Sequence, residues 1–341
     1  MNDELVLLDA IREASIRIRP LARITPLLEV TDLEGDLESS GPLFLKCENL
    51  QRSGAFKIRG AANMMLRLPE ADRRRGVITF SSGNHGIAMS LAAKLLGVPA
   101  VVVMPTTAPD VKVAAARRLG AEIVFEGTTT IERKIKTEQL AKERGLTIVP
   151  PFDHEWIVAG QGTMGLEVLD QCPQVAAVYV PASGGGMIAG VATAIKSVNP
   201  SVRIIGVEPV NANRMTRSLH AGRPMTLDSA SGIADGLLAV RPGEITFRHV
   251  QAYVDHIVTV DDDAIVRAIK WLFDHAKLVV EPSGAATVAA VLGRQDASWS
   301  RDGEARVSIP AGRPLVAVLS GGSVDAAAYG RYITGDWSTG A

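Results

Sequence analysis

Short runs of β-branched and other apolar residues alternate along the chain with longer segments in which apolar and polar positions recur at helical spacing. Strand-like runs lie at 77–80, 99–105, 121–127, 147–150, 176–181, 204–209 and 314–320. Strands that alternate with helices predict a parallel sheet built from right-handed βαβ units. Because the runs are apolar throughout, we expect helices to cover both faces of these strands.

The length and the position of two prolines predict how the chain divides. At about 150 residues per domain, a chain of 341 residues is expected to form two domains. Pro150-Pro151 forms a stiff joint after a series of compact strand–helix units. We therefore expect a small domain at 76–150, set within a large domain made of 1–75 and 151–341.

Composition narrows the class of protein. The 36 basic and 37 acidic side chains give a net charge of −1, so we expect no affinity for nucleic acid or anionic membranes. Cys47 and Cys172 are too few for a disulfide framework or a structural zinc site, which favours a reducing, cytoplasmic setting. The sequence has no long uncharged apolar run and no recognisable secretory signal, so we expect no membrane span.

The first segment that could carry chemistry is 46–61, which contains Lys57. Small residues and Phe56 precede this lysine, and Arg59-Gly60 follows it. A lysine amine is a nucleophile only when deprotonated, and burial beside an aromatic ring favours that state. The alternative is an amphipathic surface segment in which Lys57 is solvated.

A second segment, Ser81-Ser82-Gly83-Asn84-His85-Gly86, lies between a predicted strand and a predicted helix. The first backbone N–H groups of a helix have no intrahelical partner, and with the helix dipole they favour an anion such as a carboxylate. The alternative is ordinary helix capping by serine or asparagine.

Two glycine-containing turns follow later strands. In Ser183-Gly184-Gly185-Gly186-Met187, three adjacent glycines let the backbone close around a phosphate, although a tight turn without a ligand is the alternative. Ser320-Gly321-Gly322 lies at a strand's carboxyl end, where Ser320 could form a hydrogen bond with a heterocycle. Together the four segments supply an imine-forming lysine, a carboxylate site, a phosphate site and a hydroxyl. This set matches pyridoxal phosphate, whereas nicotinamide or ATP would not need the lysine.

The motifs, in order, are those of a known family. The chain resembles the threonine/serine dehydratase and serine racemase group of the fold type II, tryptophan-synthase-β-like pyridoxal phosphate enzymes, from about Thr25 to Asp325. The matching segments are 53–60, 82–85, 159–163, 184–186, Glu281-Pro282 and 320–322. The resemblance implies an α/β fold with two open, mostly parallel twisted sheets covered by helices. It also implies a homodimer.

The resemblance implies a role for each motif. Lys57 would hold the cofactor through an imine and later remove the substrate Cα proton. The cofactor-binding residues would be Phe56, Lys57, Asn84, Ser183, Gly184, Gly185, Gly186, Met187, Glu281 and Ser320. The substrate carboxylate would be bound by Ser81, Ser82, Gly83, Asn84 and His85.

The expected reaction is elimination of the β-hydroxyl from L-threonine, L-serine or a related β-hydroxy amino acid, giving a 2-oxo acid and ammonia. Ser320 favours this outcome, because a hydroxyl leaves the cofactor's pyridine nitrogen largely neutral. An alternative is a racemase, in which Ser82 acts as a second catalytic residue on the face opposite Lys57. A protein that holds the cofactor without turnover is an alternative from another class.

One departure from the resemblance concerns metal binding. Residues 208–214 are similar to the divalent-cation loop of relatives, but Arg214 stands where a second acidic residue is expected. A cation beside Arg214 would be repelled, so we expect no metal there and an ion pair between Glu208 and Arg214 instead.

Overall fold

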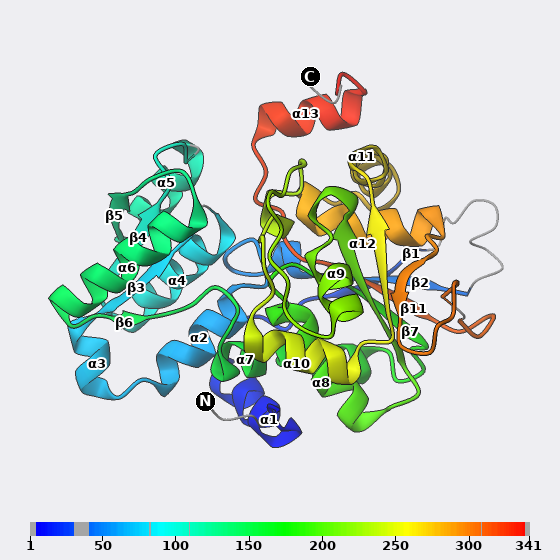
Figure 1. Cartoon of the computed structure of the whole chain (residues 1–341), viewed down its shortest axis with the longest axis horizontal. Helices are drawn as coiled ribbons and strands as arrows, with labels where there is room; N and C mark the ends of the chain where they lie inside the picture. Colours follow the sequence, from blue (N-terminus) through cyan, green and yellow to red (C-terminus); the bar gives the residue numbers. More distant parts are fainter. Residues whose placement is uncertain (1–4, 31–40, 82, 109, 308, 338–341) are drawn as a thin grey trace.

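Two sheets form the frame of the protein. The computed structural model describes residues 5–30, 41–81, 83–108, 110–307 and 309–337. The smaller sheet has four parallel strands in the order β5-β4-β3-β6 and lies to the left in Figure 1. Its strands are β3 (Val77–Phe80), β4 (Ala100–Met104), β5 (Glu122–Phe125) and β6 (Thr147–Ile148). All four are strands predicted from apolar runs.

The larger sheet has seven strands in the order β1-β2-β11-β7-β8-β9-β10. Its five central strands pair in parallel, whereas the outer pairs β1–β2 and β9–β10 are antiparallel. The predicted α/β class with mostly parallel sheets is therefore confirmed. The strands are β1 (Leu27–Val30), β2 (Leu43–Cys47), β7 (Ala177–Pro181), β8 (Arg203–Pro209), β9 (His256–Val260), β10 (Ala297–Ser300) and β11 (Leu315–Leu319).

Helices connect the strands, and several of them begin at a residue whose side chain caps the helix. Thr129 and Glu132 form a reciprocal capping box at the start of α6, and Asp261 accepts the Ala264 N–H at the start of α11. Among the described residues, none of the helices combines the length and apolar character needed to cross a membrane. The helices are α1 (Leu8–Arg17), α2 (Ile58–Arg67), α3 (Glu70–Arg75), α4 (Asn84–Leu96), α5 (Asp110–Arg118), α6 (Thr130–Arg144), α7 (Glu155–Gln171), α8 (Gly186–Val198), α9 (Arg214–Ala221), α10 (Glu244–Tyr253), α11 (Asp262–Trp271), α12 (Pro282–Gly293) and α13 (Ala326–Thr334).

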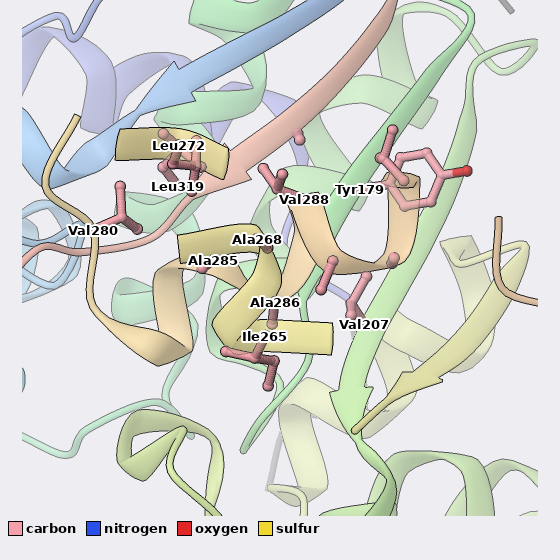
Figure 2. Close-up of a cluster of buried hydrophobic side chains, with 14 of the residues drawn as sticks. Tyr179, Val207, Ile265, Ala268, Leu272, Val280, Ala285, Ala286, Val288 and Leu319 are labelled. Carbon is pink, nitrogen blue, oxygen red and sulfur yellow. The ribbon is translucent and has the colours of Figure 1, made fainter. Parts of the chain in front are cut away.

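The larger sheet is covered on both faces, as its uninterrupted apolar strands require. Figure 2 shows one side, where Tyr179, Val207 and Leu319 of the sheet pack with Ile265 of α11 and Val288 of α12. A second buried cluster on the same strands includes side chains of α8 and α10. This packing holds β7, β8 and β11 in place, so that the loops after β7 and β11 have defined positions.

The smaller sheet shares a hydrophobic cluster with helix α2. Ile58, Ala61 and Met65 of α2 pack in one cluster with Val77 of β3 and Val102 of β4. In Figure 1, α2 lies between the two sheets. The boundaries at 76 and 150 therefore stay a prediction, since residues on both sides of position 76 contribute to one core.

Helices α2 and α7 approach closely at Gly160. A Cβ atom added to Gly160 would lie 2.6 Å from the Arg59 carbonyl oxygen and 2.7 Å from the Gly60 Cα. Both neighbours are backbone atoms, so neither can rotate away. Glycine at 160 therefore sets the distance between α7 and the first turn of α2.

We predict that Gly160→Ala lowers the free energy of unfolding by about 1–3 kcal/mol, because the added methyl group overpacks a backbone contact. The urea midpoint measures this change. Gly330→Ala in α13 is the matched control: its Cβ would meet nothing within 4 Å, so helix propensity should stabilise that variant slightly. Equal midpoints for the two variants would contradict the close-approach argument.

Candidate active site

One cavity of about 430 Å³ collects the predicted site. Loops from both sheets line it, because Ser81 follows β3, Ser183 follows β7 and Ser320 follows β11. Ligands of open α/β sheets gather at such carboxyl ends. Ser82, expected to act in catalysis and substrate binding, lies outside the described residues. The other predicted site residues all line the cavity: Phe56, Lys57, Ser81, Gly83, Asn84, His85, Ser183, Gly184, Gly185, Gly186, Met187, Glu281 and Ser320.

Lys57 directly precedes α2 and lines the cavity. Its Nζ donates a hydrogen bond of 2.8 Å to the Pro151 carbonyl and lies 5.0 Å from the centre of the Phe56 ring. Burial lowers the pKa of the Lys57 amine to about 8. A substantial fraction of this amine is therefore neutral, and hence nucleophilic, near physiological pH.

A buried ion-pair network holds the helix that begins after Lys57. The Arg59 guanidinium pairs with Glu48 at 2.8 Å and with Glu167 at 2.6 Å, and it donates to the Thr163 hydroxyl at 3.0 Å. The Lys46 Nζ also pairs with Glu167, at 2.6 Å. These contacts tie α2 to β2, to the 3₁₀ turn at 48–50 and to α7, which fixes the position from which the Lys57 side chain starts.

The turn before α8 has the shape of an anion cradle. A Cβ at Gly184 would meet the Phe152 ring at 2.6 Å, and Gly185 has a φ of +98°, which favours glycine. The backbone N–H groups of 183–186 donate to no other group in the described part of the chain. Free amides at the N-terminus of a 13-residue helix are suited to bind a phosphate.

Asn84 and Glu281 both line the cavity and are in direct contact. The Asn84 Nδ2 donates to the Glu281 carboxyl at 2.6 Å, while the buried Asn84 Oδ1 has no hydrogen-bond partner among the described residues. Burial, together with the charge of Asp235, raises the pKa of Glu281 to about 8. Glu281 is therefore mostly uncharged at neutral pH, and Asn84 keeps unused hydrogen-bonding capacity for a ligand.

Ser320 joins the Lys57 segment to the end of β11. Its carbonyl accepts a 3.0 Å hydrogen bond from the Phe56 N–H, and its hydroxyl donates only a long bond of 3.3 Å to the Ser283 carbonyl. The hydroxyl thus remains available at the floor of the cavity, carrying no charge.

His85 lines the cavity and also forms a hydrogen bond within the protein. Its Nε2 lies 3.0 Å from the Val149 carbonyl, which can only accept, so the ring donates from this nitrogen. Burial, with the nearby Lys57 charge, lowers the pKa of His85 to about 3 and keeps the ring neutral. The part assigned to His85 in binding the substrate stays a prediction.

Three charged residues of the cavity carry no sequence signal that we recognised. Lys112 of α5 forms an ion pair with Asp235 of the 3₁₀ turn Asp235–Leu237, linking the two sides of the cavity. Arg133 donates to the Thr128 carbonyl at 3.1 Å and the Thr130 hydroxyl at 3.0 Å. In the sequence, Lys112 and Arg133 are ordinary charged positions of amphipathic helices, and only the fold brings them to the cavity.

An α/β protein with a nucleophilic amine in the cavity between its sheets has the build of an enzyme. The family described as "Pyridoxal-phosphate dependent enzyme" matches residues 18–310. The chain is 41% identical over 319 residues to a serine racemase of Oryza sativa subsp. indica, with 93% of this chain and 90% of that one covered. It is 42% identical over 323 residues to the catabolic L-threonine dehydratase TdcB of Staphylococcus aureus, with coverage of 94% and 90%.

A solved structure agrees with these relatives. Maize serine racemase superposes with a TM-score of 0.87 at 37% identity, over 98% of each chain. This protein therefore belongs to the family of pyridoxal-phosphate dependent enzymes.

The cavity fits the family's cofactor. At Gly184 and Gly185 any side chain would clash with neighbouring residues, so only glycine fits there. The free amides of the glycine turn suit a phosphate. Lys57 offers an amine of lowered pKa to an aldehyde, and the Ser320 hydroxyl and the Asn84 amide offer hydrogen bonds to a ring.

We predict that the rate at which the cofactor-free protein binds pyridoxal phosphate rises ~10-fold per pH unit from pH 6 towards pH 8. Above pH 8 the rate should be constant. The reason is that only the neutral Lys57 amine reacts with an aldehyde, and its pKa is about 8. Stopped-flow absorbance measures the rate.

Glu281 also has a pKa of about 8, so Glu281→Gln is the control. The midpoint of the pH–rate curve should stay near pH 8 in this variant. A midpoint that disappears with Glu281, or one near the ordinary lysine value of 10.5, would contradict the assignment to Lys57.

Proposed function

We propose that this protein is a pyridoxal-phosphate dependent dehydratase, an ammonia-lyase acting on L-threonine, L-serine or a related β-hydroxy amino acid. The products would be a 2-oxo acid and ammonia. The observation that carries the proposal is the meeting of the Lys57 amine, the glycine turn 183–187 and the Ser320 hydroxyl in one cavity. Similarity to the S. aureus L-threonine dehydratase supports it.

Each part of the cavity would hold a part of the cofactor. Lys57 would hold the aldehyde carbon, the backbone of 183–187 the phosphate, and Ser320 the ring nitrogen, with Phe56 against the ring. Asn84 and Glu281 would complete the ring's surroundings. When bound, pyridoxal phosphate supplies an electron sink that weakens the Cα–H bond of an attached amino acid.

Lys57 would then move the proton. Its Nζ would accept the Cα proton, and a pKa of about 8 allows it to accept and release a proton near neutral pH. The segment 81–85, which leads into the first turn of α4, would hold the substrate carboxylate at the N-terminal end of that helix. Held there, the substrate presents its Cα to the lysine.

Ser320 would bias the reaction towards elimination. A carboxylate in its place would hold a ring nitrogen in the protonated form and spread the developing negative charge into the ring. The neutral hydroxyl of Ser320 provides no such counter-charge, so it would favour loss of the β-substituent over spreading charge into the ring.

Racemisation is the second candidate function. The serine racemases of rice and maize are both similar to this chain, and Ser82 follows Ser81 in the sequence. In this alternative the Ser82 hydroxyl would return a proton to the face of Cα opposite Lys57. A protein that holds the cofactor without turnover would show the absorbance and release no 2-oxo acid.

The assembly and the location of the protein also stay proposals. We infer a homodimer from the family resemblance and a cytoplasmic location from the scarcity of cysteine. Sedimentation of the loaded protein tests the dimer, and fractionation of the source cells tests the location.

We predict that Lys57→Ala abolishes both the visible absorbance of the loaded protein and ammonia release from L-serine and L-threonine. Only an amine can hold the aldehyde and accept the Cα proton at this position. Lys270→Ala is the control, because Lys270 is exposed in α11 and pairs with Asp274. Turnover retained by Lys57→Ala would reject the proposed function.

We predict that Ser82→Ala retains most 2-oxo acid production from L-serine and loses any formation of D-serine, because elimination needs only the proton transfer at Lys57. A panel of L- and D-β-hydroxy amino acids, scored for 2-oxo acid and for inverted enantiomer, measures both. Elimination lost together with racemisation, or racemisation retained without Ser82, would contradict this assignment.

A further inference from the structure

A buried cation lies behind the glycine turn. Arg214, the first residue of α9, has no exposed surface and is not among the residues that line the cavity. Its Nη2 donates to the Ala182 carbonyl at 2.8 Å and its Nε to the Ser183 carbonyl at 3.1 Å. Nη1 donates to the Ala212 carbonyl. Two of its three acceptors are thus the carbonyls of the residue just before the glycine turn and of the first residue in it.

The geometry of the peptide bond shows in which direction the N–H groups of the turn point. In a trans peptide the N–H points opposite to the preceding C=O, and the described residues contain no cis peptide. Carbonyls of Ala182 and Ser183 that point back to Arg214 therefore aim the N–H groups of 183 and 184 away from it, towards the cavity. By binding the carbonyls on one side of the turn, Arg214 thus orients the N–H groups on the side of the cavity.

The next peptide is held in the same way by other donors. The Gly184 carbonyl accepts from the Thr246 hydroxyl at 2.6 Å and from the Gly243 N–H at 3.1 Å. Three consecutive carbonyls, 182 to 184, are thus fixed from behind, and the three amides that follow them, 183 to 185, face forward together.

An acidic side chain lies near Arg214 but does not occupy its hydrogen-bond donors. Glu208, also fully buried, lies 3.9 Å from the guanidinium. The Glu208 oxygens accept instead from the Met215 N–H at 3.0 Å and from the Thr216 N–H and hydroxyl at 2.8 and 2.7 Å. This bears out the expected proximity of the two charges, although hydrogen bonds from the start of α9, not from Arg214, satisfy the carboxylate.

The oxygens around Arg214 are also those that a hard divalent cation would choose. A carboxylate and three backbone carbonyls surround one buried position, and calcium or magnesium prefers such ligands. A guanidinium fixed in the chain occupies that position and repels a second cation.

We propose that Arg214 is a positioning residue for the cofactor phosphate, a resident cation that holds the start of the glycine turn, at residues 182 and 183, from behind and makes a divalent ion unnecessary there. The inference rests on the proposed function in one respect, that the turn binds the phosphate of pyridoxal phosphate.

The test compares pyridoxal phosphate with pyridoxal, which lacks the phosphate, in equilibrium binding to the cofactor-free protein. We expect Arg214→Met to raise the Kd for pyridoxal phosphate by roughly 10- to 100-fold, the range for lost charged hydrogen bonds, and to change the Kd for pyridoxal by less than about 3-fold. Arg214→Lys keeps the charge but reaches fewer carbonyls, so it should fall between. EDTA should leave the wild-type Kd unchanged.

A milder variant keeps the test valid if Arg214→Met does not fold. Thr246→Val removes the donor to Gly184 and should weaken pyridoxal phosphate selectively. Thr193→Val is its matched control, since that buried hydroxyl bonds to Ala189 and His249 and does not touch the turn.

Equal weakening of both ligands would show a general structural role and overturn the inference, as would a wild-type Kd that magnesium improves after chelation. In either case, retained dependence of turnover on Lys57 would leave the proposed function standing. No binding of pyridoxal phosphate by the wild-type protein would reject the proposed function instead.

Discussion

The guanidinium of Arg59 carries its charge in the interior, where only 1% of the residue is exposed. Its position is stable because Glu48 and Glu167 reach it from two different elements, and loss of one partner from such a pair costs about 3–5 kcal/mol. The 3₁₀ turn after β2, the start of α2 and the middle of α7 must therefore meet at this point. Lys57 stands two residues before Arg59, so the same network determines where the reactive amine enters the cavity.

Around that amine, burial drives the titrating groups towards neutrality. The pKa values of Lys57 and Glu281 are both about 8, and that of His85 is about 3. Between pH 8 and the ordinary lysine value of 10.5, the unfolded Lys57 holds a proton that the folded one lacks, so its contribution to stability rises with pH across this range and is at its most unfavourable below it. At neutral pH, burial of Lys57 therefore lowers the stability of the fold, and the same burial makes the amine reactive. Backbone amides at the starts of α4 and α8 contribute to the cavity's attraction for anions, together with the lining side chains Lys112 and Arg133.

The sequence predicts the parts of this arrangement that depend on local pattern. Uninterrupted apolar runs located the four strands of the smaller sheet and β7, β8 and β11 of the larger one. The predicted site residues came to line one cavity wherever they are described. Four strands of the larger sheet were not predicted: β1, β2, β9 and β10. β1 is short and two of its four residues are exposed, whereas polar residues interrupt β2 (Lys46) and β9 (His256 and Thr259). Lys112 and Arg133 were missed for another reason: their place in the cavity depends on how the small sheet packs, which no local spacing encodes.

The central claim concerns one amine, and chemical trapping tests it most directly. Borohydride reduction of the protein loaded with pyridoxal phosphate fixes the cofactor to the side chain that holds it, and peptide mapping by mass spectrometry then locates the label. The account predicts a single labelled peptide, modified at Lys57. A label on Lys112, the other lysine of the cavity, or a protein that remains unlabelled after loading, would contradict it.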